Sequence, residues 1–260
     1  MRVLLLAALF PALFPVMAFA QNTQNAESAQ QQSVRVVVPV AGSVTGANDV
    51  RWRTALELVN NVGAEVTVAV TLMSAPDQPA VLTTIGAGDT VAFADVATEA
   101  FGIDNILSPI VVETLGRRSV TVRATAYGVR GDTLFKPEPI AINYGPTWSP
   151  IRVLQGLSFT DAFRTNVGLV NLGDKATTFV LAVQRLPGRN LAVARVPMPP
   201  YSLWHVPIQM LFPMITNGDD FSIVIETSSP DTYAYASVIE NETNSATFIQ
   251  PQVGVSAGGQ

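Results

Sequence analysis

The chain contains no cysteine and only one histidine, His205. Without cysteine there is no disulfide, no thiolate metal site and no cysteine nucleophile. A serine-histidine-aspartate mechanism would have to use His205, and a zinc site built on histidines would lack most of its ligands. We therefore expect no cofactor and no metal site, and we expect the protein not to be an enzyme.

Charge is also scarce. Only 13% of the residues are charged, and the chain has two lysines and a formal net charge of −5. A mildly acidic chain offers no basic surface to a phosphate backbone, so we expect no nucleic-acid partner. Apolar sequence is abundant, because 48% of the 260 residues are hydrophobic. That is enough material for the cores of two domains of ordinary size.

The chain repeats itself. Residues 53–60 (RTALELVN) return 111 positions later as residues 164–171 (RTNVGLVN), and an aromatic residue, Trp52 or Phe163, precedes each copy. Further matches follow downstream, namely 112–114 with 225–227 and 124–127 with 234–237. A period of this length is the size of one small domain and too long for a solenoid unit. The sequence therefore predicts two tandem copies of one fold.

Residues 1–20 have the anatomy of a secretory signal peptide, with Arg2 before an apolar stretch and a small-x-small cleavage signal that ends at Ala20. The alternative is a membrane anchor, because an apolar stretch of about 18 residues is borderline for spanning. Pro11 and Pro15 disfavour a long continuous helix there. We expect cleavage near Ala20, export to the periplasm or the exterior, and membrane contact only through the export signal.

Regular strand patterns begin after a Gln-rich segment, residues 21–33, which we expect to be a disordered tether. Residues 66–72 alternate β-branched side chains between two faces, and residues 179–184 do the same. Turn residues separate the predicted strands. The other predicted strands are residues 35–40, 53–60, 90–93, 119–126, 166–171, 203–206, 221–227 and 232–239.

Short strands with frequent turns predict an all-β protein of two tandem immunoglobulin-like (Ig-like) β-sandwich domains related by internal duplication. A helical turn is expected at residues 95–101, with Asp95 as N-cap, and at the corresponding residues 208–211. The expected boundaries are residues 34–136 for domain 1, 137–150 for a Pro-rich linker, 151–252 for domain 2 and 253–260 for a flexible tail.

The run aromatic-Arg-Thr-x-Leu/Val-x-Leu-Val-Asn, followed by Gly and a Thr/Val strand, resembles a recurrent Ig-like β-sandwich repeat of secreted bacterial proteins. The later Val/Ile-Glu-Thr strand is similar to the same repeat. The resemblance covers most of residues 37–127 and 153–250. Proteins with this repeat usually have no assigned activity, so the resemblance implies a fold and no chemistry.

Arg53 and Arg164 recur in the two copies, as do Glu113 and Glu226. Paired catalytic carboxylates would be expected once, in a cleft, whereas a feature repeated in each domain suits a structural role. We hypothesise that Arg53 bonds Glu113 and that Arg164 bonds Glu226, each pair joining two strands of one sandwich.

Aromatic side chains offer a weaker candidate site, a sugar-binding platform made of Trp148, Trp204 and Tyr201. We expect Trp52 in the core, because its counterpart is also aromatic. Residues 217–220 (NGDD) carry oxygen ligands that calcium could use, but their spacing matches no calcium loop, and an ordinary turn is expected. Residues 130–132 (RGD) are expected to form a turn as well.

These observations favour an exported, non-enzymatic structural or protein-interaction protein. The alternatives are a periplasmic assembly chaperone, which would need a basic cleft between its two domains, and a cell-surface carbohydrate-binding module. The partner is expected to be a protein or a surface glycan, and its identity stays open, as does the oligomeric state.

Overall fold

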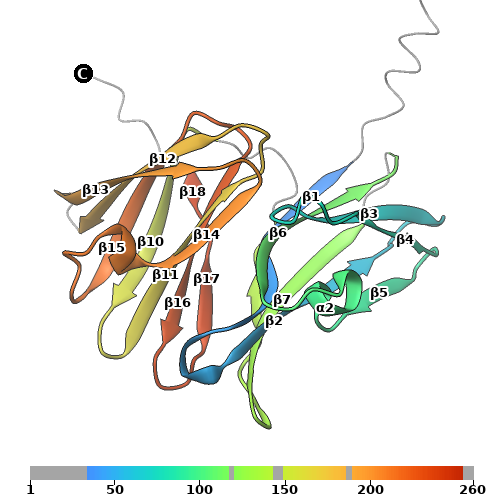
Figure 1. Ribbon diagram of the computed structural model, residues 1–260, viewed down its shortest axis with the longest axis horizontal. Helices are drawn as coiled ribbons and strands as arrows, with labels where there is room; N and C mark the ends of the chain where they lie inside the picture. Colours follow the sequence, from blue (N-terminus) through green and yellow to red (C-terminus); the bar gives the residue numbers. More distant parts are fainter. Residues whose placement is uncertain (1–33, 117–119, 143–148, 186–188, 254–260) are drawn as a thin grey trace, which may run out of the picture. The chain divides into compact units, whose positions relative to one another are not determined.

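The computed structural model describes residues 34–116, 120–142, 149–185 and 189–253. The expected signal peptide, the tether and the tail after Val253 lie outside these residues. Within the described ranges nearly all of the regular secondary structure is β-strand, which confirms the predicted all-β class (Figure 1). No helix of these ranges has the length and apolar character needed to cross a membrane.

The first half forms a nine-stranded sheet. Its main path is β4-β3-β6-β1-β2-β7-β8, with β5 paired to β2 and β9 paired to β7. The strands and the 3-10 turn η1 are β1 (Arg35–Thr45), η1 (Ala47–Asp49), β2 (Arg51–Val59), β3 (Val66–Leu72), β4 (Val81–Ile85), β5 (Thr90–Phe93), β6 (Ile106–Thr114), β7 (Thr121–Arg130), β8 (Thr133–Leu134) and β9 (Glu138–Ile140).

Strand β1 changes partners along its length. Most of it pairs with β6, its last residues pair with β2, and its register shifts after Val38. A shift of this kind bends a strand. The hydroxyl of Thr54 on β2 stabilises the bend, because it accepts a hydrogen bond from the Gly42 N–H at 3.1 Å. A side chain at Gly42 would overlap the Ile106 carbonyl, so glycine is required at this close approach.

The second half forms two separate sheets, which pack against each other as a sandwich (Figure 1). The five-stranded sheet has the order β13-β12-β15-β10-β18, and the four-stranded sheet has the order β14-β11-β16-β17. Their strands are β10 (Ile151–Phe159), β11 (Phe163–Asn171), β12 (Thr177–Arg185), β13 (Arg189–Met198), β14 (Ser202–Pro207), β15 (Gly218–Glu226), β16 (Thr232–Glu240), β17 (Ala246–Ile249) and β18 (Gln252–Val253).

Six strand pairings of the first half recur in the second. They are β1–β6 with β10–β15, β2–β7 with β11–β16, β2–β5 with β11–β14, β3–β4 with β12–β13, β3–β6 with β12–β15, and β7–β9 with β16–β17. One expected equivalence changes, because Leu56 pairs with Ala124 while its counterpart Val167 pairs with Ala236. The sequence match had set Ala124 against Ala234.

The short helices lie where the sequence predicts them, at α2 (Val96–Phe101) and α3 (Ile208–Leu211). Asp95 occupies the N-cap position of α2, but its side chain makes no capping hydrogen bond. The first half extends further than expected, because β9 lies inside the expected linker and pairs with β7. Pro139 fits there because β9 pairs with β7 alone, and proline is tolerated on an edge strand.

Each half has its own apolar core. Alternate residues of β3 (Val66, Val68, Val70 and Leu72) are buried in the first core, as the period-two pattern predicts. Phe179, Leu181 and Val183 of β12 are buried in the second. A third cluster contains residues of both halves, and it consists of Val37, Val111, Val170, Leu172, Tyr233 and Tyr235. The two halves are therefore in apolar contact within one compact unit.

Candidate functional site

A groove of about 550 Å³ lies between the two halves. The first half lines it with residues of β1, β2, β6, β7 and β9, and the second half with residues of β11, β14, β16 and β17. Much of the lining is apolar, including Val40, Val44, Leu107, Ile140, Ile239 and Phe248. A volume of this size falls within the range of about 300–1,000 Å³ that is typical of small-molecule sites.

Strand β2 places Arg53 at the groove. The Nη1 atom of Arg53 lies 3.5 Å from Oδ2 of Asp95, whose side chain is only 2% exposed. Neither carboxylate oxygen of Asp95 has a hydrogen-bond partner within the described ranges, and the buried Nε of Arg53 has none either. A buried carboxylate lowers the stability of the fold unless an opposite charge or hydrogen bonds compensate for its lost hydration. Because the carboxylate of Asp95 has no hydrogen-bond partner in the described ranges, Arg53 is the group that compensates.

Arg164, the counterpart of Arg53 in the repeat, reaches the same groove from β11. Its Nη1 donates to Oδ1 of Asn241 at 2.7 Å, and its Nη2 donates to Oδ1 of Asn244 at 3.0 Å. Both acceptors are neutral, and no carboxylate in the described ranges lies within 4.0 Å of this guanidinium. Burial lowers the pKa of Arg164, because desolvation disfavours the charged form.

Three aromatic rings line the groove on the side of the second half. His205 stacks on Tyr235 with a centroid separation of 5.7 Å, and Tyr235 stacks on Phe248 at 4.9 Å. Asn166 donates through Nδ2 to His205 Nε2 at 3.2 Å, so the neutral ring carries its proton on Nδ1 and donates it to Tyr235 Oη at 2.9 Å. Burial lowers the pKa of His205 to about 4, which keeps the ring neutral at pH 7.

The expected pairs Arg53–Glu113 and Arg164–Glu226 are wrong. Strand β1 separates β2 from β6, and Arg53 lies opposite Ser43 while Glu113 lies opposite Arg35, roughly 25 Å away along the strand. Glu113 instead forms an ion pair with Arg35, whose Nε lies 3.8 Å from Oε1 of Glu113. Arg164 bonds Asn241 and Asn244, and Glu226 lies in the other sheet, opposite Ile151 at the start of β10.

The predicted aromatic platform is only partly described. Trp204 and Tyr201 are exposed, at 42% and 36%, while Trp148 lies outside the described residues. The platform therefore stays a prediction. Trp52 differs from the expectation, because it is half-buried and lines the groove instead of lying in the core.

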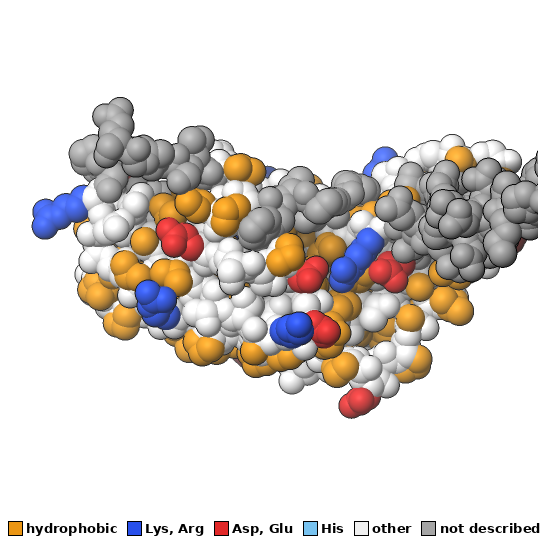
Figure 2. Space-filling model, turned by 90° about the horizontal axis from the view of Figure 1, so that it is seen from above, with side chains coloured by type: hydrophobic (Ala, Val, Ile, Leu, Met, Phe, Trp, Pro, Cys, Tyr) orange, Lys and Arg blue, Asp and Glu red, His pale blue; other side chains and the backbone are white. Residues whose placement is uncertain are grey.

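An apolar strip crosses the outer face of the five-stranded sheet. Val193, Ala182, Val224 and Val153 lie directly opposite one another on β13, β12, β15 and β10. Their neighbours along each strand are buried on the core side, so these four side chains face outward. Val193 is 57% exposed, and Ala182, Val224 and Val153 are half-buried. Figure 2 shows hydrophobic side chains lying between separate acidic and basic ones on the face that it presents.

Sequence reasoning missed this strip, although it noted the apolar alternation of β12. Residues 179–183 (FVLAV) are apolar on both faces of the strand, whereas a sheet with one solvated face normally alternates apolar and polar residues. This run of residues, apolar on both faces of the strand, is the sequence feature that could have revealed the strip. Only the register, however, shows that β10, β13 and β15 contribute to the same row.

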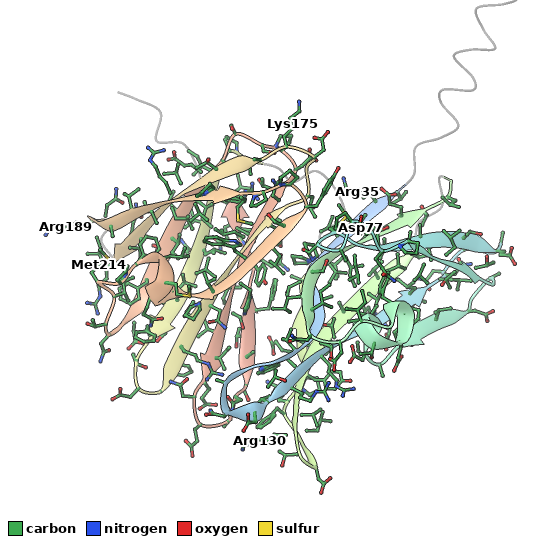
Figure 3. All side chains as sticks on the ribbon, in the orientation of Figure 1. Arg35, Asp77, Arg130, Lys175, Arg189 and Met214 are labelled. Carbon is green, nitrogen blue, oxygen red and sulfur yellow. The ribbon has the colours of Figure 1, made fainter. Side chains whose placement is uncertain are left out.

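The two weaker motifs have structural positions. The RGD motif spans the end of β7 and the turn into β8. Arg130 is the last residue of β7, and its guanidinium lies 5.4 Å from the centre of the Phe135 ring (Figure 3). Residues 217–220 lie at the start of β15, where Asp219 accepts a hydrogen bond from Ser158. Across the described ranges, no group of three or more His, Cys, Asp or Glu side chains could hold a metal ion.

The groove can therefore supply a guanidinium and an apolar wall to a ligand, and the strip can supply a row of apolar side chains to a partner.

Comparison with protein-family models, with curated proteins and with solved structures finds no match to this chain.

Proposed function

We propose that this chain is an exported, non-enzymatic protein that binds a protein partner, and that it consists of two Ig-like β-sandwich modules related by duplication. The apolar strip on the outer face of the five-stranded sheet carries the proposal. A contiguous row of apolar side chains on the outer face of a sheet is a candidate protein contact surface. Strand β13 also forms one edge of this sheet, so its backbone is open to pairing next to Val193.

Other observations support parts of this proposal. The six recurring strand pairings support duplication. The apolar N-terminal stretch with its cleavage signal supports export. The hydrogen bonds of His205 support a non-enzymatic role, because its ring nitrogens contact Asn166 and Tyr235 rather than a serine and a carboxylate.

The chaperone alternative has less support. Its cleft would need several free cationic groups, but Arg53 is offset by Asp95 and Glu138 also lines the groove, which leaves Arg164 among the described residues of the groove. The carbohydrate alternative relies on Trp204 and Tyr201, which are exposed. Neither has an observation as specific as the strip.

Site-specific photo-crosslinking on the native cell surface tests the proposal. A photoreactive residue at position 193 should capture one defined protein, and Val224→Lys in the same chain should abolish that capture. Thr178→Lys is the matched control, because Thr178 is exposed on the same face of β12 but outside the strip. Capture that is insensitive to Val224→Lys, or absent from position 193, overturns the proposal.

Export has a separate test. The N-terminus of the protein recovered from outside the cytoplasm should be Gln21, the residue after the expected cleavage site. A protein that keeps Met1 and fractionates with membranes would instead support the anchor alternative.

A further inference from the structure

The groove combines an apolar wall with a cation that has no acidic partner in the described ranges. Val44, Leu107 and Ile140 line it from the first half, and Ile239 from the second. Arg164 is half-buried at the same groove, and within the described ranges its side chain donates hydrogen bonds to the neutral side chains of Asn241 and Asn244. An apolar pocket with one convergent charged group is the usual composition of a small-molecule site.

The charges around the groove favour an anion at Arg164. Asp95 lies next to Arg53, and Glu138 uses Oε1 to accept the Phe248 N–H at 3.4 Å. Neither carboxylate lies within 4.0 Å of Arg164. A guanidinium binds a carboxylate through two parallel hydrogen bonds. The partly buried setting strengthens that attraction, because the local dielectric is lower than that of water.

We propose that this groove binds a straight-chain alkyl carboxylate, with its head group on Arg164 and its chain along the apolar walls. A groove of about 550 Å³ accommodates a ligand with a chain of roughly ten carbons. The rings of Tyr235 and Phe248 form part of the surface that the chain covers. This small-molecule site goes beyond the protein partner proposed above, which binds the outer face of the five-stranded sheet.

Calorimetric titration of the full chain tests the proposal with decanoate and decanol, which share their alkyl chain and differ in charge. Decanoate should bind at least about tenfold more tightly than decanol, because only the carboxylate pairs with Arg164. In the series hexanoate, octanoate and decanoate, each added methylene should tighten binding about fourfold until the groove is filled.

Two variants locate the head group. Arg164→Gln should weaken decanoate binding at least about tenfold and leave decanol binding unchanged. Arg123→Gln is the matched control, since Arg123 is an exposed arginine on β7 whose ion-pair partner is Glu57 at 3.7 Å. It should leave both affinities unchanged.

A third variant keeps the test valid if Arg164→Gln fails to fold. Ala246 is half-buried and lines the groove, so Ala246→Phe should fill the space and abolish decanoate binding. The proposal is overturned if decanol binds as tightly as decanoate, or if no alkyl carboxylate binds saturably. It is also overturned if an acetylated apolar hexapeptide with a free C-terminus binds at Arg164 more tightly than decanoate. The crosslinking result at position 193 is independent of all these outcomes.

Discussion

The side chains of Asn60 and Asn171, 111 positions apart, make matching sets of hydrogen bonds. The Nδ2 of Asn60 contacts the carbonyl oxygens of Ala64, Ile85 and Gly86, and that of Asn171 contacts those of Lys175, Met198 and Pro199. Each Oδ1 accepts a backbone N–H two residues later, from Val62 or Gly173. Each asparagine thus ties the loop after its strand to the end of another strand.

Replacing Asn60 with alanine should destabilise the protein by about 2–3 kcal/mol, because buried carbonyl groups then lose their donor. Asn171→Ala should have a similar effect. Urea unfolding followed by circular dichroism measures the change. The control is Asn61→Ala, since Asn61 is exposed and its side chain donates to Thr121 Oγ1 at 2.9 Å; its effect should stay within about 0.5 kcal/mol. Equal effects of Asn60→Ala and Asn61→Ala would contradict this role.

Removing the positive charge of Arg53, next to Asp95, should also lower the free energy of unfolding. Arg53→Met leaves a buried carboxylate without its counter-ion, and we expect a loss of about 3–5 kcal/mol in the free energy of unfolding. The double variant Arg53→Met/Asp95→Leu should recover most of that loss, because neither charge is then buried. Arg123→Met, which removes the exposed pair with Glu57, should cost at most about 1 kcal/mol. A double variant no more stable than Arg53→Met would argue against the pair.

The stability of the protein should fall in mildly acidic solution because of His205. The pKa of His205 is lowered from 6.5 to about 4 in the folded state. Between these two values the unfolded chain binds a proton that the folded chain does not, so the free energy of unfolding decreases as the pH falls. Urea unfolding at a series of pH values should show this slope in the wild type and a smaller one in His205→Gln. Parallel profiles for the two proteins would refute the assignment.

Gly168 should tolerate no side chain, because a methyl group built there overlaps the ring of Tyr235. Gly168→Ala should therefore displace the ring stack and destabilise the protein by about 1–3 kcal/mol, the usual range for overpacking. Gly63→Ala serves as control, since a methyl group at this exposed loop position meets nothing within 4 Å. Thermal unfolding measures both changes. If Gly168→Ala matches the control, the ring stack is looser than the structure indicates.

Local sequence patterns were enough to predict the all-β class and the strands with clean alternation, such as β3 and β12. Among the strands that were not predicted, β10 and β13 each carry an irregularity that obscures the period of two. Gly156 of β10 has a φ of 70° and lies within a register shift. In β13 the pairing shifts at Leu191, which leaves that residue without a partner on β12.

The candidate sites were harder to predict than the fold. The repeat identified Arg53 and Arg164 as candidate site residues. Their partners, however, depend on which strands are neighbours in the sheets, and the sequence does not show this order. Asp95 was assigned as a helix cap from its position before α2, and only the fold shows that its carboxylate lies next to Arg53. The groove requires faces of two halves to meet, and no pattern within either copy encodes that contact.

Because of strand β1, the two halves should differ in how they unfold. This strand is hydrogen-bonded to both β6 and β2, which joins the strands of the first half into one sheet. The two sheets of the second half share no strand pairing in the described ranges and are held together by side-chain packing and by hydrogen bonds of side chains such as Arg152 and Thr165. Opening the first half requires breaking a continuous backbone ladder. The second half can separate along its core without breaking any sheet, so partial unfolding under mechanical load should begin there.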